Sequence, residues 1–318
     1  MSKIIIFGCG QIGSRHLQGL ALCRIALDIT VFDPSPTALQ TAKERWQQVV
    51  TSGTKHQIKF VDELPARGAE FSVGIVATSA KGRADIVETL VGLYSLSFLI
   101  LEKTLEQSVE GLLRLQNAVE PVVKTWVNTP RRVCDWHQCP GIGSNGLAFN
   151  VNHSGPSWGI ACNAIHFIDV LNWWTGAKVS SVDTSGLDER WYESKRAGYF
   201  DIEGRLAVGF CDGSSLTLLS DPRDAGDLVL TINRSDGQSW YCNETARVAG
   251  EVGGEEIHNI PPHQSEITGE LVEQILSAGS CKLPSLEVSI MLHKPLIQAF
   301  VEHWNVTMEN NSTYVPIT

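Results

Sequence analysis

The sequence lacks the features that mark several specialised classes of protein. Its eight cysteines include no C-x-x-C pair, which argues against a zinc site and against a disulfide framework. Acidic residues outnumber basic ones, 35 to 25, and the net charge of -10 disfavours nucleic acid or an anionic membrane as a partner. Each apolar run is much shorter than a membrane-spanning helix, which needs about 20 residues. No internal repeat and no low-complexity segment occurs.

What remains is the composition of an ordinary globular protein. The 318 residues exceed what one compact core usually holds, so two domains are expected. The first residues, MSKIIIFGCG, lead directly into a strand and a glycine turn and do not read as a signal peptide. Together with the scattered cysteines, this indicates a cytoplasmic protein with reduced thiols.

In residues 1–128, strand-like and helix-like patterns of apolar residues alternate. Short apolar runs typical of buried strands are separated by stretches with helical periodicity. We expect strands at residues 3–7, 29–32, 71–78, 98–101 and 122–127, with a weaker one before Asp62, and helices at residues 12–23, 37–49, 83–92 and 109–119. The alternation predicts an α/β domain, a Rossmann doubly wound parallel sheet over residues 1–128.

The pattern changes after residue 128. Longer and more polar strands appear, with Asp-Gly turns at residues 212–213 and 236–237 that indicate antiparallel hairpins, one of them over residues 204–220. Helical patterns cover residues 159–174, 266–277 and 286–304, and the tail at 312–318 is expected to add a last strand. Residues 129–318 therefore predict a C-terminal α+β domain, for substrate binding and oligomerisation, built on a large mainly antiparallel sheet.

A glycine-rich turn follows the first strand in the segment IIIFGCGQIGSRH. Gly8, Gly10 and Gly13 form G-x-G-x-x-G at the opening of a helix, where the glycines permit a tight turn, close approach to a pyrophosphate and close packing of helix on strand. The intervening Gln11 and Ile12 then contribute backbone N–H groups at a helix N-terminus that favours phosphate. The segment predicts a dinucleotide site.

Asp33 ends the second strand, twenty residues beyond Gly13. A carboxylate in this position can accept hydrogen bonds from both ribose hydroxyls and repels a 2′-phosphate, which favours NAD over NADP. The alternative is that Asp33 only starts the turn at Pro34.

A glycine or polar residues follow five strands of the predicted parallel sheet. Ligands bind at the carboxyl ends of the strands in such sheets, so these residues are expected to lie together at one edge. They are Gly8, Asp33, Thr78, Ser79, Glu102, Lys103 and Asn128, the last followed by Arg131 and Arg132.

Three segments resemble motifs of the Gfo/Idh/MocA oxidoreductases, the glucose-fructose oxidoreductase and inositol dehydrogenase superfamily. VGIVATSAKGR resembles the family's A-T-P-x-x-x-H segment, LILEKT its E-K-P motif, and WGIACNAIHFIDVLNWWTG its G-x-x-x-D-x-G-x-H-x-x-D helix. The resemblance covers the whole chain. It implies that Lys103 lies beside the nicotinamide and the reacting hydroxyl, and that His166 faces it from the second domain. A desolvated lysine near another cation can exchange protons near neutral pH.

The resemblance and the sheet-edge argument together give a set of expected site residues. No metal ligand is among them. Lys103 and His166 are the expected catalytic residues; the expected NAD-binding residues are Gly8, Gly10, Gln11, Ile12, Gly13, Asp33, Thr78, Ser79, Arg83, Glu102 and Lys103; the expected substrate-binding residues are Asn128, Arg131, His153 and Asn163. Alternatives stay open: Lys103 as a surface lysine paired with Glu102 or Glu106, His166 as a buried histidine with local hydrogen bonds, and His153 as a solvent-facing strand residue.

Three positions depart from the family pattern. Thr104 replaces the proline of E-K-P, and a cis bond before threonine costs about 2.5–4 kcal/mol, so a trans or else strained bond is expected. Arg83 replaces a histidine. Cys162 replaces an aspartate, so the helix face reads Cys162, Asn163, His166 and Asp169, and Asp169 is the acid that remains to orient His166. Cys162 is expected to pack rather than to act as a nucleophile or to bind zinc with His166.

These features predict an NAD-dependent oxidoreductase that acts on a secondary alcohol or ketone of a sugar, amino sugar or nucleotide sugar. The resemblance of the tail suggests surface-polysaccharide or nonulosonic-acid biosynthesis. The alternatives are an enzyme with tightly bound, recycled NAD that catalyses elimination or glycoside hydrolysis, and a non-catalytic NAD(H)-binding regulator. The resemblance also implies a homodimer or homotetramer.

Overall fold

The computed structural model describes residues 1–51, 53–119 and 123–318, and its chain divides into two compact units. The first unit comprises Met1–Glu106, Gly111–Asn128 and Pro262–Leu286. The second comprises Gln107–Glu110, Thr129–Pro261 and Glu287–Thr318.

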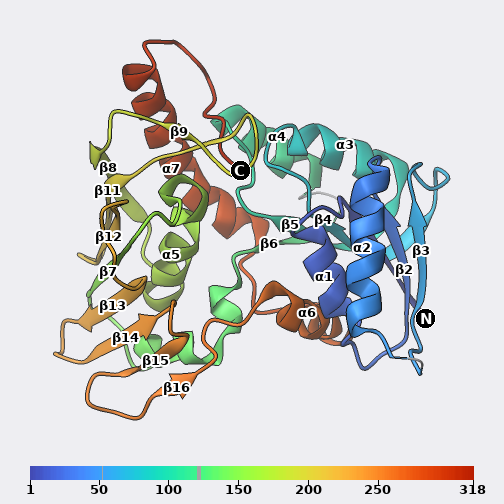
Figure 1. Cartoon of the computed structure of the whole chain (residues 1–318), viewed down its shortest axis with the longest axis horizontal. Helices are drawn as coiled ribbons and strands as arrows, with labels where there is room; N and C mark the ends of the chain where they lie inside the picture. Colours follow the sequence, from blue (N-terminus) through green and yellow to red (C-terminus); the bar gives the residue numbers. More distant parts are fainter. Residues whose placement is uncertain (52, 120–122) are drawn as a thin grey trace. The chain divides into compact units, whose positions relative to one another are not determined.

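The first unit is built on a parallel six-stranded sheet (Figure 1). The strands β1 (Ser2–Phe7), β2 (Leu27–Phe32), β3 (Gln57–Val61), β4 (Glu70–Val76), β5 (Ser95–Glu102) and β6 (Lys124–Asn128) lie in the order β3-β2-β1-β4-β5-β6. Their connections contain helices α1 (Gly13–Leu20), α2 (Pro36–Val49), α3 (Arg83–Leu93) and α4 (Val109–Val119). Ile4, Ile5 and Ile6 are all fully buried, so both faces of the sheet are covered.

The strand order confirms the predicted Rossmann fold. It reverses between β1 and β4, which makes the carboxyl ends of these strands the point where such folds bind ligands. The strand expected at residues 122–127 begins at Lys124 in the structure, and Val122 lies outside the described residues.

Helix α6 (Gln264–Ala278) lies beside α1, although more than two hundred residues separate them in sequence (Figure 1). The helices approach closely: the Cys23 thiol donates to the Gly269 carbonyl at 3.4 Å, and a Cβ added to Gly269 would lie 2.6 Å from the carbonyl oxygen of Gly19. Residues Pro262–Leu286 therefore pack with the first unit, whereas the sequence analysis placed them in a 129–318 domain.

The second unit is built on an eight-stranded sheet. The strands are β7 (Phe149–Gly155), β8 (Val179–Leu187), β11 (Gly204–Phe210), β12 (Ser215–Ser220), β13 (Val229–Arg234), β14 (Ser239–Asn243), β15 (Val248–Glu251) and β16 (Ile257–His258). They lie in the order β16-β15-β14-β13-β7-β12-β11-β8; β7 and β12 run parallel and the other pairs antiparallel. This confirms the predicted mainly antiparallel sheet and both Asp-Gly hairpins.

The second unit also contains two helices, α5 (Ile160–Thr175) and α7 (Leu286–Thr307), of which α7 begins at the last residue of the first unit. Its short elements are the 3₁₀ helices η1 (Pro130–Val133) and η2 (Asp135–Gly141) and the paired strands β9 (Tyr192–Glu193) and β10 (Phe200–Asp201). Helix α5 packs on the sheet at β12 and buries Ile165, Ile168 and Leu171.

The chain's last residues form no strand, which corrects the expectation for residues 312–318. Single backbone hydrogen bonds hold the tail instead: Val315 N donates to Gln107 O at 3.0 Å, and Phe200 N donates to Pro316 O at 2.8 Å. Pro316 has no amide hydrogen to continue a ladder.

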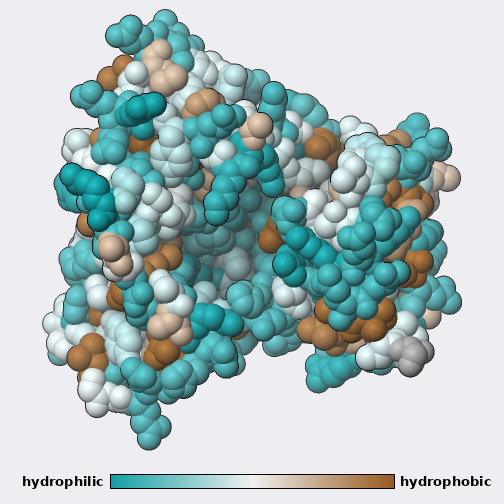
Figure 2. All heavy atoms as spheres, viewed as in Figure 1, coloured by the Kyte–Doolittle hydropathy of each residue, from teal (hydrophilic) through white to brown (hydrophobic). Residues whose placement is uncertain are grey.

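The visible surface is mainly hydrophilic, with small hydrophobic patches (Figure 2). Large exposed apolar residues such as Leu22, Ile142 and Val306 come from separate elements. Among the described residues, no helix combines the length and apolar character needed to cross a membrane.

The close approach of α1 and α6 predicts different effects for two glycine substitutions. Gly269→Ala forces a Cβ against the Gly19 carbonyl and should lower the free energy of unfolding by about 1–3 kcal/mol. Gly92→Ala, in α3, meets nothing within 4 Å and should raise it by about 0.5–1 kcal/mol. Urea unfolding followed by circular dichroism measures both, and similar effects for the two variants would refute this packing.

Candidate active site

The glycine-rich turn joins β1 to α1 at the carboxyl end of the sheet. Gly8 has φ +84°, and a Cβ on Gly13 would lie 1.9 Å from the Gly8 carbonyl oxygen, so the fold itself requires both glycines. A Cβ on Gly10 would meet nothing within 4 Å. The protein therefore does not need glycine at position 10 for its own packing, and the bare backbone there leaves room for a ligand.

Arg45, on α2, fixes the turn from the side. Its Nη1 donates to Gln11 O at 2.9 Å and to Ser14 Oγ at 2.6 Å, and its Nη2 donates to Gln11 Oε1 at 2.5 Å. Burial and the nearby Arg15 lower the pKa of Arg45. The sequence analysis missed Arg45, because a single arginine on an amphipathic helix carries no motif.

Asp33 lies against the glycine turn. Its Oδ2 accepts from Cys9 N at 2.8 Å and its Oδ1 accepts from Ser35 N at 2.9 Å. Both interpretations of Asp33 thus have a structural counterpart: the residue starts a turn, and it stands beside the predicted phosphate site. A carboxylate has four lone-pair sites, so acceptors remain for ribose hydroxyls.

Arg83 opens α3 and is fully buried. Its Nη1 donates to the carbonyl oxygens of Glu102 at 2.6 Å, of Leu105 at 3.0 Å and of Thr104, and its Nη2 donates to Thr78 O at 2.5 Å. Its guanidinium group thus donates hydrogen bonds to the end of β5 and to the loops after β4 and β5. Arg83 therefore holds these loops, and its expected contact with NAD stays a prediction.

The peptide bond between Lys103 and Thr104 is cis, whereas the sequence predicted a trans or else strained bond. Arg83 binds the carbonyl oxygens of Glu102 and Thr104, the residues on either side of Lys103. Lys103 itself is half-buried at the end of β5, and Thr78 and Ser79 are half-buried at the end of β4.

Glu102 is held in a buried polar network. Its Oε1 lies 2.8 Å from His16 Nε2 and accepts a hydrogen bond from Asn128 Nδ2. His16 Nδ1 lies 3.0 Å from Thr268 Oγ1, and Asn128 Nδ2 donates to Gln264 Oε1 at 2.7 Å. Glu102 and Asn128 were expected to bind NAD and substrate, yet they are only 5% and 2% exposed and bind one another.

The network keeps Glu102 ionised. Burial raises the pKa of its carboxyl, but the hydrogen bond and charge of His16 and the Asn128 amide outweigh burial, so the pKa lies below its usual value. The sequence analysis missed His16, although it stands three residues after Gly13 in the same segment, and it missed Gln264 and Thr268, which no local pattern connects to β5.

In the second unit, the predicted polar face of α5 has two parts. Cys162, Asn163 and His166 are half-buried, and the Asn163 side-chain amide donates to the Trp158 and Gly159 carbonyls at 2.9 and 3.0 Å. Asp169 is buried; its two carboxylate oxygens accept from Arg132 at 2.8 and 2.7 Å. Asp169 therefore binds Arg132, and its expected role in orienting His166 stays a prediction.

Arg131 and His153 meet at a residue that the sequence analysis missed, Glu244. Arg131 Nη2 donates to Glu244 Oε1 at 2.6 Å, and His153 Nε2 lies 3.4 Å from the same oxygen. Burial raises the pKa of Glu244, but the charge of Arg131 and contacts with His153 outweigh burial and hold the pKa well below its usual range.

His153 is 1% exposed and its ring packs against Phe167 and Trp158, so the solvent-facing alternative is wrong. Arg131 also lies over the Phe167 ring, 4.0 Å from its centroid. Within the described ranges, no three His, Cys, Asp or Glu side chains are arranged to hold a metal ion.

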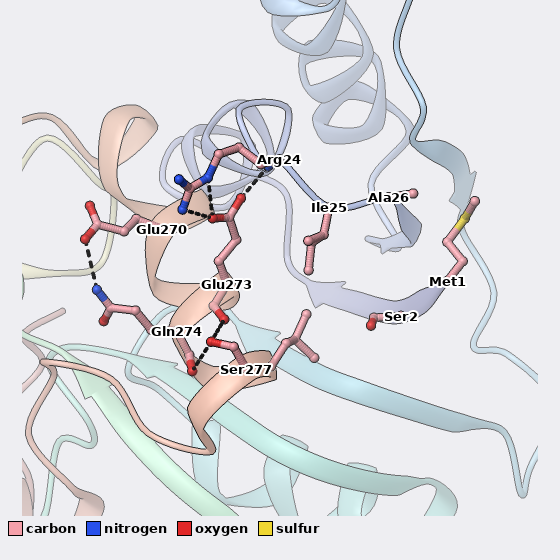
Figure 3. Close-up of a pocket in the computed structure, with 10 residues that line it drawn as sticks. Met1, Ser2, Arg24, Ile25, Ala26, Glu270, Glu273, Gln274 and Ser277 are labelled. Carbon is pink, nitrogen blue, oxygen red and sulfur yellow. Dashed lines mark hydrogen bonds and ion pairs between the residues drawn. The ribbon is translucent and has the colours of Figure 1, made fainter.

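A pocket of about 720 Å³ lies elsewhere in the first unit (Figure 3). Its lining includes Ser2 and Ala26, at the amino ends of β1 and β2, and the Arg24–Glu273 ion pair beside α6. The glycine turn and Asp33 stand at the carboxyl ends of the same strands. The pocket is therefore separate from the predicted NAD site.

The sequence matches no protein-family model, and no curated protein matches it. The structure resembles scyllo-inositol dehydrogenase from Lactobacillus casei with bound NAD(H) and scyllo-inositol (16% identity, 93% of this chain and 95% of that one, TM-score 0.65). It also resembles a myo-inositol dehydrogenase from Corynebacterium glutamicum (14% identity, 95% of this chain and 96% of that one, TM-score 0.64). A third similar structure is a Gfo/Idh/MocA family oxidoreductase from Vibrio cholerae (13% identity, 98% of this chain and 100% of that one, TM-score 0.63).

The chain therefore has the fold of the Gfo/Idh/MocA oxidoreductases over nearly its whole length. The fold that the three motifs implied is confirmed.

The buried network around Glu102 predicts a large effect of His16→Ala. The variant leaves a buried carboxylate short of a partner and should lower the free energy of unfolding by about 3–5 kcal/mol near neutral pH. The loss should shrink in acid: the folded-state pKa of Glu102 is lowered, so its contribution exists above the unfolded pKa and vanishes as pH falls through the folded one.

Urea unfolding at a series of pH values measures this effect. Arg24→Ala, which breaks an exposed ion pair with Glu273 on the neighbouring helix, is the control and should leave stability almost unchanged. An equally small effect of His16→Ala would show that the network contributes nothing.

Proposed function

We propose that this protein is an NAD-dependent oxidoreductase that transfers hydride between nicotinamide and a secondary alcohol or ketone of a carbohydrate. The supporting observation is the turn after β1: Gly8 and Gly13 are required by the fold, Gly10 leaves its backbone open, and Asp33 stands beside them. The similar Lactobacillus casei structure has NAD(H) and a cyclic polyol bound.

The residues present fit NAD. The open backbone at Gly10 and the first turn of α1 suit a pyrophosphate, and Asp33 suits a ribose without a 2′-phosphate. Bound NAD would supply the hydride acceptor.

The chain's own residues would handle the proton. In alcohol oxidation, Lys103 or His166 takes the proton of the hydroxyl group while hydride passes from the carbon that bears it to the nicotinamide. In ketone reduction, the same residue returns the proton to the oxygen. Arg83 and the Glu102 network hold the backbone on either side of Lys103, so its position is fixed from both directions.

The substrate proposal covers sugars, amino sugars, nucleotide sugars and inositols. A role in surface-polysaccharide or nonulosonic-acid biosynthesis belongs to the same proposal and follows from the resemblance of the tail. A cytoplasmic homodimer or homotetramer that assembles through the sheet of the second unit is proposed with it, and light scattering after gel filtration would measure the oligomer.

Gly10→Ala should weaken NADH binding without unfolding the protein. The added methyl group meets no protein atom within 4 Å but occupies space that a pyrophosphate needs, so affinity should fall at least about tenfold. Fluorescence titration with NADH measures the affinity, with Gly92→Ala as the matched control. Unchanged affinity in Gly10→Ala would mean that NAD binds elsewhere or not at all.

Lys103→Ala should lower the rate of NAD reduction about 10²-fold or more, since it removes the proposed proton-transfer group, while NADH still binds. The measurement is absorbance of NADH over a panel of inositols, sugars, amino sugars and nucleotide sugars. A wild-type protein that turns substrate over without accumulating NADH would be an enzyme with recycled NAD. A wild-type protein that binds NADH and transforms nothing would be a regulator.

A further inference from the structure

The amino end of α1 presents two backbone amides without acceptors. No side chain caps the helix, and its first turn contains no acidic residue. Neither the Gln11 amide nor the Ile12 amide donates a hydrogen bond to another described residue. These are the amides that the sequence analysis expected at the phosphate of a dinucleotide. A helix start of this kind suits an anion, but it does not by itself define a site.

Arg45 contacts the carbonyl side of the same two peptide groups. Its Nη1 donates to Gln11 O at 2.9 Å, and this carbonyl belongs to the peptide group that carries the Ile12 N–H. Nη1 also donates to Ser14 Oγ at 2.6 Å, and Ser14 Oγ donates to Gly10 O at 2.6 Å. The Gly10 carbonyl belongs to the peptide group that carries the Gln11 N–H. The guanidinium group thus reaches one peptide group directly and the other through a single hydroxyl.

A hydrogen bond to a carbonyl oxygen polarises the whole peptide group. It draws electron density toward the oxygen and makes the N–H of the same group a stronger donor, and a charged donor has the larger effect. Ser14 N adds a further bond to Gly10 O at 3.0 Å. The Gln11 and Ile12 amides should therefore bind an anion more tightly than ordinary exposed amides would.

The charge of Arg45 is not balanced by a carboxylate. Among the ion pairs of the described residues, none includes Arg45 or Arg15. Arg15 donates instead to the neutral side chain of Gln18 at 2.7 Å, and the same side chain donates to Arg45 O at 3.0 Å. Two neighbouring cations without an acid, in a chain of net charge -10, favour a negative charge that a ligand supplies.

The Arg45 side chain is held at both ends. Helices α1 and α2 pack side by side, and the bond from Gln18 ties the Arg45 backbone to α1 (Figure 1). At the other end, Nη2 donates to Gln11 Oε1 at 2.5 Å. The guanidinium group is thus placed before any ligand arrives, which lowers the entropy cost of binding.

We propose that Arg45 is a positioning residue of the dinucleotide site: through its bonds to Gln11 and, by way of Ser14, to Gly10, it fixes and polarises the two amides that bind a pyrophosphate. The inference rests on the proposed function, since it takes the ligand of the turn to be NAD. It extends the site from the glycine turn to α2, which no motif connects to it.

Arg45→Met should raise the Kd for NADH about tenfold, because it keeps the apolar stem and removes the charge and all three bonds. Fluorescence titration with NADH measures the Kd. ADP-ribose has the same pyrophosphate without the nicotinamide, so its Kd, measured by titration calorimetry, should rise by about the same factor.

A ligand-free measurement tests the polarisation itself. Hydroxide removes the proton of a polarised amide beside a cation more readily, so exchange of the Gln11 and Ile12 amide hydrogens with water should slow about threefold in Arg45→Met. Nuclear magnetic resonance of ¹⁵N-labelled protein measures this exchange. A turn that Arg45 only packs against would loosen in the variant, and the exchange would then be unchanged or faster.

Arg24→Met is the matched control. It makes the same substitution in the same unit, at an arginine that is paired with Glu273 and lines the pocket at the amino ends of β1 and β2. Both Kd values and the exchange of the two amides should stay as in the wild type.

Two milder substitutions grade the effect and replace Arg45→Met if urea unfolding shows that it does not fold. Arg45→Lys keeps the charge but lacks the planar fork that holds Gln11 and Ser14 together, so the NADH affinity should fall about threefold. Ser14→Ala removes only the link to Gly10 and should cost a similar factor. In the double variant Arg45→Met/Ser14→Ala the loss should be smaller than the product of the two single losses, because Ser14 acts together with Arg45.

The outcomes separate this inference from the proposed function. If a substrate of the panel reduces NAD and the NADH affinity is the same in Arg45→Met as in the wild type, the role of Arg45 is refuted and the function stands. If NADH and ADP-ribose both bind more weakly in Arg45→Met but not in Arg24→Met, while no substrate reduces NAD, the role of Arg45 stands and the function is refuted. Weaker binding with faster amide exchange would make Arg45 a packing residue and refute its polarising role. A wild type that binds neither ligand would refute both.

Discussion

The first unit depends on keeping a carboxylate buried at the end of β5. An ionised Glu102 without partners would cost several kcal/mol in desolvation, so its position requires donors from other elements. They come from His16 on α1 and Asn128 on β6, and Gln264 and Thr268 on α6 complete the network. The requirement explains why α6 packs in the first unit although it follows the second sheet in the chain. The same residues fix the strand end that carries Lys103.

Polar residues at this edge of the sheet divide into two groups. Arg83, Glu102 and Asn128 have the residue types expected of ligands, yet each forms hydrogen bonds within the protein. Gly10 and Lys103 stand at the surface of this layer, with Gly10 exposed and Lys103 half-buried. Residues of both groups occur in the sequence motifs, because a residue that positions a catalytic group can be exchanged as little as the catalytic group itself. Burial separates them, and the sequence alone does not show burial.

The sequence predicted those features that depend on near neighbours. The alternation of strands and helices, the glycine turn and the two Asp-Gly hairpins each arise within a short segment, and the structure has them. What could not be predicted involves partners that are distant in sequence. Arg83 contacts the backbone beside the cis bond at Lys103. The His153 ring is buried against Phe167 and Trp158, and α6 packs against His16 and Gly19. Glu244 was missed for the same reason, since it stands in no motif.

The first turn of α5 shows how a helix can take its cap from another segment. Gly159, the N-cap residue, has no side chain that could accept a hydrogen bond, and Asp201 on β10 accepts from Ala161 N at 2.8 Å instead. A carboxylate near the first turn of a helix is favoured by the helix dipole whether it comes from the helix or from a neighbouring strand. Glycine at position 159 makes this contact possible, because a Cβ there would lie 2.6 Å from Asp201 Oδ2.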